Sequence, residues 1–103
     1  MMLSDEKIQD ILKNEIKSWL YDKESKYIKR EISTKNFKET MMILNLIAGL
    51  SEAHFHHPDI EFGYKKILIK LKTHSENAVT QKDIDLAKDI EKYISMILER
   101  EKK

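Results

Sequence analysis

The chain has 103 residues, a length that we expect to fold as a single domain over residues 1–103. Nineteen Lys and Arg residues nearly balance eighteen Asp and Glu residues, so no strong net charge favours nucleic acid or an anionic membrane as a partner. The sequence contains no cysteine, which excludes disulfides and thiolate chemistry within it and fits a cytoplasmic location. No apolar run approaches the roughly 20 residues of a membrane span, so we expect no membrane insertion.

The first predicted element is a short helix over about residues 5–14. Ser4 is a favourable N-cap, and acidic residues follow it in the first turn, where the helix dipole favours negative charge. One apolar stripe then marks the buried side of this helix: Ile8, Ile11 and Leu12.

An antiparallel hairpin is predicted next, with strands over residues 19–21 and 27–32 and a polar loop between them. The alternation of the second strand is imperfect, because Arg30 shares a face with Ile28 and Ile32.

A long helix is predicted from about residue 36 to residue 53, with Ser33 or Thr34 as its cap. It is apolar almost all round from Met41 to Leu50, which is typical of a helix that is buried on more than one side. Two explanations remain open, a central helix wrapped by its own chain or a helix that forms an oligomer interface. We favour the interface, because one layer of so short a chain cannot cover both sides.

Residues 59–74 are predicted to form a second hairpin with a tight turn near Tyr64 and Lys65. Its last strand alternates, with Ile67, Ile69 and Leu71 on the core side and Lys66, Leu68, Lys70 and Lys72 on the other. His74 has the parity of the lysines, so it should leave the strand away from the core or at its rim. The lysine row is most simply a solvated sheet face; a phosphate or nucleic-acid site is the alternative.

The last helix should begin with a capping box at Thr80–Asp83, after a loop over residues 75–79 in which Asn77 tolerates a left-handed conformation. Its inner stripe comprises Ile84, Ala87, Ile90, Ile94, Ile97 and Leu98, and a charged, frayed tail follows over residues 99–103. The predicted order is α-β-β-α-β-β-α. The predicted fold class is α+β, a four-stranded antiparallel sheet with three helices packed on one face.

All four histidines lie between Glu52 and His74, together with the only proline, Pro58. Imidazole is the side chain whose unperturbed charge change falls between about pH 5 and pH 8. Three interpretations compete: a metal site, a structural helix end, and general acid–base catalysis. Adjacent histidines aim poorly at one ion, which disfavours metal, and His54 alone is best explained as a helix-end residue.

The acid–base interpretation depends on a turn and a neighbouring strand end. Pro58 fixes its own φ and biases His57 toward extended structure, which holds that imidazole in one direction. His56 and His57 would then face His74.

Four segments together resemble the pterin-4a-carbinolamine dehydratase family. They are Glu52-x-x-x-His56-His57-Pro58, Tyr64-Lys65-Lys66, Thr73-His74, and Thr80-x-x-Asp83-x-x-Leu86-Ala87. The resemblance extends upstream through Phe37 and, more weakly, to Trp19. It covers nearly the whole chain.

The resemblance implies an enzyme that removes water from 4a-hydroxytetrahydropterin to give quinonoid dihydropterin, in tetrahydrobiopterin recycling, without a metal or redox cofactor. It also implies a homodimer or homotetramer, for which helix 36–53 is the natural contact. Two alternatives stay open: a protein-interaction module that acts as a dimerisation cofactor, and a pterin-binding protein of other pterin metabolism, such as that of molybdopterin.

By resemblance, His56 and His74 are the acid–base pair, and His57 is a third catalytic-site residue with a binding or auxiliary role. The residues expected to bind the pterin are Glu52, Pro58, Thr73, Ser75 and Trp19. Alternatives exist for three positions: Glu52 as a solvated carboxylate, Trp19 as core packing, and Asp83 as a structural cap.

Overall fold

The computed structural model describes the backbone of residues 1–101 and the side chains of residues 1–98. Its elements are α1 (Asp5–Glu15), β1 (Leu20–Asp22), β2 (Tyr27–Ser33), α2 (Phe37–Ala53), β3 (Asp59–Gly63), β4 (Lys66–Leu71) and α3 (Gln81–Glu101). The predicted order is therefore confirmed. The tail predicted to fray begins at residue 99, but α3 continues through Glu101, and residues 102–103 lie outside the described part. No helix in the described part is long and apolar enough to cross a membrane.

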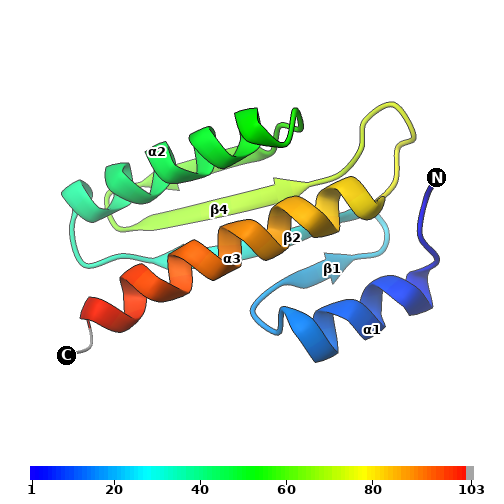
Figure 1. Ribbon diagram of the computed structural model, residues 1–103, viewed down its shortest axis with the longest axis horizontal. Helices are drawn as coiled ribbons and strands as arrows, with labels where there is room; N and C mark the ends of the chain where they lie inside the picture. Colours follow the sequence, from blue (N-terminus) through cyan, green and yellow to red (C-terminus); the bar gives the residue numbers. More distant parts are fainter. Residues whose placement is uncertain (102–103) are drawn as a thin grey trace.

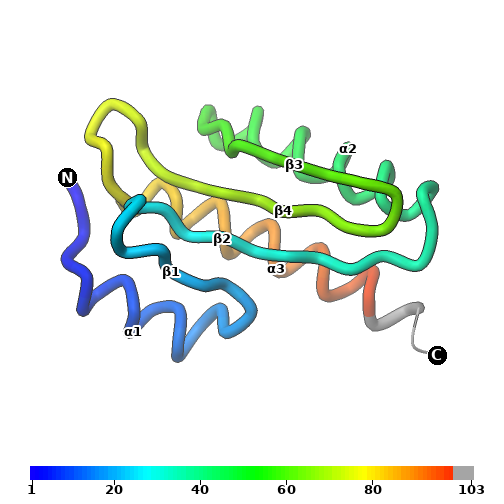
Figure 2. Tube along the Cα trace, turned by 180° about the vertical axis from the view of Figure 1, so that it is seen from behind, coloured from blue at the N-terminus to red at the C-terminus, as the bar shows by residue number. Residues whose placement is uncertain are grey.

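The four strands form one antiparallel sheet in the order β1-β2-β4-β3. Figure 1 shows α2 and α3 lying side by side across one face, with α1 beside β1. Seen from behind, the strands lie in front of the helices and the opposite face of the sheet is bare (Figure 2). The predicted α+β architecture is thus confirmed, and one sheet face remains without a helix.

A single apolar core fills the space between the sheet and the helices. β2 and β4 contribute Ile28, Ile32, Ile67, Ile69 and Leu71, and α3 contributes Ile84, Ile90 and Ile94, all at most 1% exposed. This distribution confirms the predicted inward faces of the last strand and the last helix.

Arg30 lies on the apolar face of β2 because α3 provides a partner for it. Its Nε donates to Glu91 Oε1 at 2.8 Å and its Nη2 to Glu91 Oε2 at 3.2 Å. The indole N–H of Trp19 donates to the same Oε1 at 2.8 Å. Buried charge is tolerated when it is paired and hydrogen-bonded, which explains the imperfect alternation of this strand.

The helix caps are partly as predicted. Ser4 Oγ accepts from the backbone N–H of Lys7 at 3.1 Å, as an N-cap does. The predicted cap of α2 at Ser33 or Thr34 is wrong, because Asn36 directly precedes the helix and accepts from the N–H of Glu39 at 2.8 Å. Thr34 lies too far upstream to reach these amides, and its hydroxyl contacts Thr40 instead.

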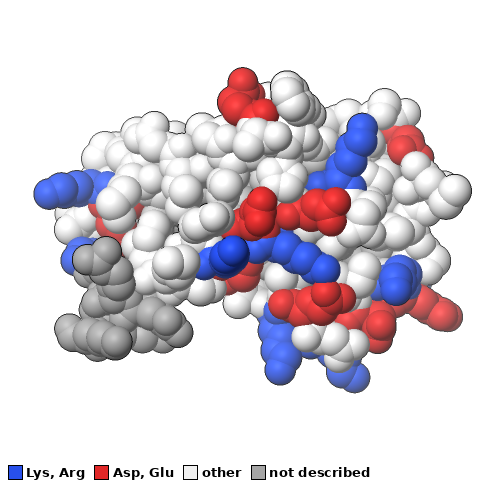
Figure 3. All heavy atoms as spheres, in the orientation of Figure 1, with Lys and Arg blue, Asp and Glu red and all other residues white. Residues whose placement is uncertain are grey.

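The outer face of α2 is uncharged over much of its length. Ile43 and Ile47 are fully buried, whereas Phe37, Met42, Ala48 and Gly49 are exposed. Figure 3 shows few charged side chains over α2, in contrast to the mixed charges over α3 and α1.

Candidate active site

The histidines lie in two turns next to the start of α3, residues 54–58 after α2 and residues 74–77 after β4. The Nε2 atom of every histidine faces a carboxylate oxygen. The four pairs are His54–Asp89 at 2.7 Å, His56–Asp83 at 2.5 Å, His57–Glu52 at 2.5 Å and His74–Asp59 at 3.3 Å. β4 ends at Leu71, so His74 follows the strand in a turn rather than ending the strand as predicted.

The turn after α2 is a Schellman motif. The N–H of His56 donates to the carbonyl of Ser51 and the N–H of Phe55 to that of Glu52, each at 3.1 Å. Phe55 has φ of 51°, the left-handed conformation that usually falls to Gly or Asn at this position. The motif ends the helix at Ala53 and sends His56 toward α3.

The His56–Asp83 pair is the buried centre of the site. Asp83 is fully buried and only 12% of the His56 side chain is exposed. Asp83 Oδ2 accepts from the N–H of Thr80 at 2.8 Å and from Thr73 Oγ1 at 2.9 Å, which leaves Oδ1 for His56. A carboxylate accepts hydrogen bonds, so in the neutral form of His56 the hydrogen is on Nε2 and Nδ1 is an acceptor.

Asp83 therefore has two functions, of which the sequence predicted one. Its bond to the Thr80 N–H confirms the predicted capping box. Its contact with His56 joins residues 27 positions apart and depends on how α2 packs against α3. The Thr80-x-x-Asp83 spacing gives no sign of this second contact.

The other two predicted catalytic histidines are open to solvent. His57 and Glu52 are 68% and 74% exposed, and His74 and Asp59 are 64% and 72% exposed. α2 ends at Ala53, and the carboxylate of Glu52 contacts the imidazole of His57 beyond that end. Exposed pairs of this kind hold their geometry weakly.

The remaining predicted site residues have different surroundings. Pro58 is half-buried in the turn that holds His57, and Ser75 is exposed in the turn that holds His74. Thr73 is buried, and its hydroxyl bonds Asp83 and Thr80, so it supports the buried pair. Trp19 is 2% exposed, within the core.

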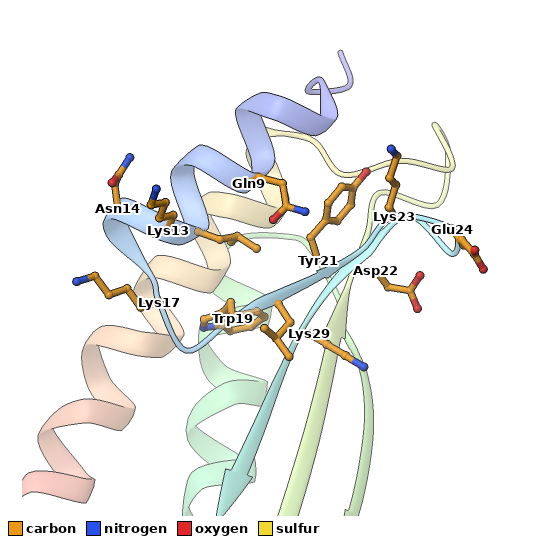
Figure 4. Close-up of a pocket in the computed structure, with 12 residues that line it drawn as sticks. Gln9, Lys13, Asn14, Lys17, Trp19, Tyr21, Asp22, Lys23, Glu24 and Lys29 are labelled. Carbon is orange, nitrogen blue, oxygen red and sulfur yellow. The ribbon is translucent and has the colours of Figure 1, made fainter.

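Trp19 also borders an open groove of about 1140 Å³ between α1 and β1, distinct from the histidine turns. Figure 4 shows lysines and polar side chains around this groove, and no histidine is among the twelve residues drawn. Burial, together with a hydrogen bond to Asp5, raises the pKa of Tyr21 to about 12. The backbone N–H of Ser25 lowers the pKa of Asp22. Both shifts move these two groups further from titration near neutral pH.

The histidine turns offer proton transfer as their chemistry. The three predicted catalytic imidazoles, of His56, His57 and His74, lie on these two turns, each with a carboxylate that can orient it. Imidazole suits both donation and acceptance of a proton near neutral pH. Among the described residues, no group of three or more His, Asp or Glu side chains could hold a metal ion.

Comparisons with known proteins identify a family. A family model described as Pterin 4 alpha carbinolamine dehydratase matches residues 1–93. A protein of Aquifex aeolicus is 44% identical over 96 residues, which cover 93% of this chain and 94% of that protein. A protein of Sulfolobus acidocaldarius is 37% identical over 92 residues, which cover 89% of this chain and 98% of that protein. Both are named "Putative pterin-4-alpha-carbinolamine dehydratase".

Two solved structures have a similar fold. The crystal structure of a transcriptional coactivator/pterin dehydratase from Brucella melitensis matches with a TM-score of 0.81 at 27% identity, over 87% of this chain and 95% of that chain. A pterin dehydratase-like protein described as a RuBisCO assembly factor of the alpha-carboxysome matches with a TM-score of 0.61 at 22% identity, over 71% and 84% of the two chains. The second likeness is one of fold alone.

Proposed function

Since the chain belongs to the pterin 4 alpha carbinolamine dehydratase family, we propose that it removes water from a 4a-hydroxytetrahydropterin and releases a quinonoid dihydropterin. In this elimination the C4a–O bond breaks, the proton on N5 is lost, and a C4a=N5 double bond forms. One group must protonate the leaving hydroxyl and another must accept the N5 proton. The observation that supports the proposal most is the buried His56–Asp83 pair beside two exposed imidazoles.

His56 is assigned as the base in this proposal. Its Nε2–H is held by Asp83, so Nδ1 is the nitrogen with a free lone pair. His74 is assigned as the acid, because its exposed ring can regain a proton from water after each turnover. His57 binds the pterin or assists, with Glu52 to orient it. Positioned acid–base groups contribute roughly 10²- to 10⁴-fold to a rate.

The test is the loss of 4a-hydroxytetrahydropterin followed with and without enzyme. Wild type should accelerate it over buffer, and His56→Ala and His74→Ala should each lower kcat by about 100-fold or more. His54→Ala is the matched control, because His54 pairs with Asp89 outside the proposed set and its loss should leave kcat near that of wild type. A wild type no faster than buffer contradicts the function; full activity in both variants contradicts only the residue assignment.

The same chain is proposed to form a homodimer or homotetramer through α2. Support comes from the exposed, uncharged face that includes Met42 and Ala48, and from Gly49, where open space surrounds the backbone. Small residues on a helix face permit close approach of a second helix. Ala48→Glu should reduce the mass measured by sedimentation, whereas Leu20→Glu, at an exposed leucine of β1, should not. An unchanged mass for Ala48→Glu would contradict an α2 interface.

Protein interaction is the second candidate function, and the same uncharged surface supports it. The Brucella melitensis structure is described as that of a coactivator as well as a dehydratase. An interaction surface on α2 would be separable from the histidines. Ala48→Glu should therefore retain most of the dehydration rate. A loss of activity equal to that of His56→Ala would show that the α2 surface and the histidine site are coupled.

A further inference from the structure

The groove of about 1140 Å³ between α1 and β1 follows a free edge of the sheet. β1 is the first strand in the order β1-β2-β4-β3, so it pairs with β2 on one side only, and α1 lies beyond its other side (Figure 1, Figure 2). Within the described part, no hydrogen bond from outside the sheet reaches the backbone of Leu20 or Tyr21. Antiparallel strands alternate between bonded and non-bonded residues, so β1 directs at least one N–H and one C=O toward the open edge.

Lysines dominate the charge of the groove wall. Four lysines and two acidic residues line it: Lys13, Lys17, Lys23, Lys29, Asp22 and Glu24. Lys23 Nζ lies 3.9 Å from Asp5 Oδ2, whereas no carboxylate of the described residues forms an ion pair with Lys13 or Lys17. Figure 4 shows these two lysines on the α1 side of the groove and Lys29 on the strand side. An acidic ligand would supply the carboxylates that the described chain does not.

The other side chains of the wall decide which anionic ligand fits. Single-stranded nucleic acid binds by stacking its bases on exposed aromatic rings. Here Trp19 is 2% exposed, and the hydroxyl of Tyr21 donates to Asp5 Oδ1 at 2.6 Å. The groove is also larger than the roughly 300–1,000 Å³ of small-molecule pockets. An extended peptide is the ligand whose backbone matches the free groups of a sheet edge.

Leu20 and the lysines narrow the choice of peptide. Leu20 is 61% exposed and offers one apolar contact at the start of β1. Side chains alternate along an extended peptide, so an apolar side chain beside Leu20 is compatible with acidic ones at the neighbouring positions. Lysines at a sheet edge repel a second copy of the same edge. The groove therefore suits an acidic chain better than another copy of this protein.

We propose that the α1–β1 groove binds an extended acidic segment of a partner protein, which adds a strand to β1 and places carboxylates near Lys13 and Lys17. The groove lies apart from the histidine turns, so the inference does not depend on the proposed dehydration. β1 has only three residues, which limits the number of backbone hydrogen bonds and makes the binding weak and reversible. The lysines then select the partner by its charge.

A fluorescent, end-capped peptide of sequence Glu-Val-Glu-Val-Glu-Val-Glu is the probe, titrated with the full chain and followed by anisotropy. Wild type should bind it saturably with a Kd of about 100 μM. Lys13→Glu and Lys17→Glu should each weaken the binding about fivefold, because each places a negative charge beside the acidic peptide. Lys7→Glu is the matched control, since Lys7 is exposed on α1 but lies outside the groove, and its Kd should stay within about twofold of wild type.

A second peptide separates strand addition from attraction of charge alone. With proline in place of each valine, the peptide keeps its charge but loses N–H donors, and it should bind at least about tenfold more weakly. In ¹⁵N-edited NMR spectra, the valine peptide should shift the amides of β1 much more than those of β3 at the opposite edge of the sheet.

Four results would overturn the proposal. They are no saturable binding below about 1 mM, equal affinity for the two peptides, equal shifts at both sheet edges, and unchanged binding in both Lys13→Glu and Lys17→Glu. A short single strand of deoxythymidine that binds more tightly than the valine peptide, and loses that affinity in Lys13→Glu, would identify a nucleic-acid site and also overturn it.

Discussion

The His56–Asp83 and His74–Asp59 pairs have the same chemistry in opposite environments. Asp83 is buried and bonded to Thr80 and Thr73 as well as to His56, so its position is fixed before any ligand arrives. Asp59 is mostly exposed and lies 3.3 Å from His74. A buried and fully bonded pair is strongly held, whereas an exposed pair contributes little and is easily rearranged. One imidazole is preorganised, and the other can adapt to the substrate.

The largest effect should come from breaking the buried pair. Asp83→Ala removes the acceptor for the Thr80 N–H, the Thr73 hydroxyl and His56, and leaves these donors buried. We expect a loss of about 3 kcal/mol in the free energy of unfolding, measured by urea denaturation. Asp59→Ala removes only an exposed contact and should cost less than about 0.5 kcal/mol. Equal losses in the two variants would contradict the difference between the pairs.

A subtler change should alter the tautomer of His56 with less effect on stability. In Asp83→Asn, the side-chain oxygen is needed by Thr80 and Thr73, so the amide NH₂ faces His56 Nε2. The ring must then hold its hydrogen on Nδ1, which blocks the proposed base. We expect kcat to fall about 100-fold, and ¹⁵N spectra of the imidazole should show the change from an Nε2–H to an Nδ1–H ring.

Asp59→Asn is the control for that experiment. The exposed His74 can exchange its hydrogen-bond partner for water, so kcat should fall by less than about tenfold. An Asp83→Asn enzyme that keeps both its rate and its Nε2–H tautomer would show that Asp83 does not orient His56.

The sequence predicted most of the elements, because their signals are local. Ser4 caps α1 as expected, and the alternation of Ile67 and Ile69 placed the core face of β4. The cap of α2 was misplaced, because several polar residues precede the helix and only backbone geometry selects Asn36.

The site was less predictable, because its decisive contacts join distant segments. His56 meets Asp83 across 27 residues, and His54 meets Asp89 across 35. The histidines could be selected from their spacing and from a resemblance. The burial of His56 and the partners of His54 and His56 depend on the packing of α2 against α3, and the partner of His74 depends on the pairing of β3 with β4.

The smallest effect concerns the turn at Phe55, which lies between two residues that contact α3, His54 and His56. Phe55 is 89% exposed, so its side chain gains little in the monomer to offset its left-handed backbone. His54 and His56 on either side are held by Asp89 and Asp83, which keeps the turn in place despite that cost. Phe55→Gly should raise the free energy of unfolding by about 1 kcal/mol, since glycine adopts this conformation freely. Phe55→Ala retains the backbone cost and should show almost no gain in the free energy of unfolding.

The same variant tests what orients His56. If Asp83 orients it, Phe55→Gly should keep kcat within about twofold of wild type. A much larger fall in kcat would show that the left-handed turn at Phe55 orients His56.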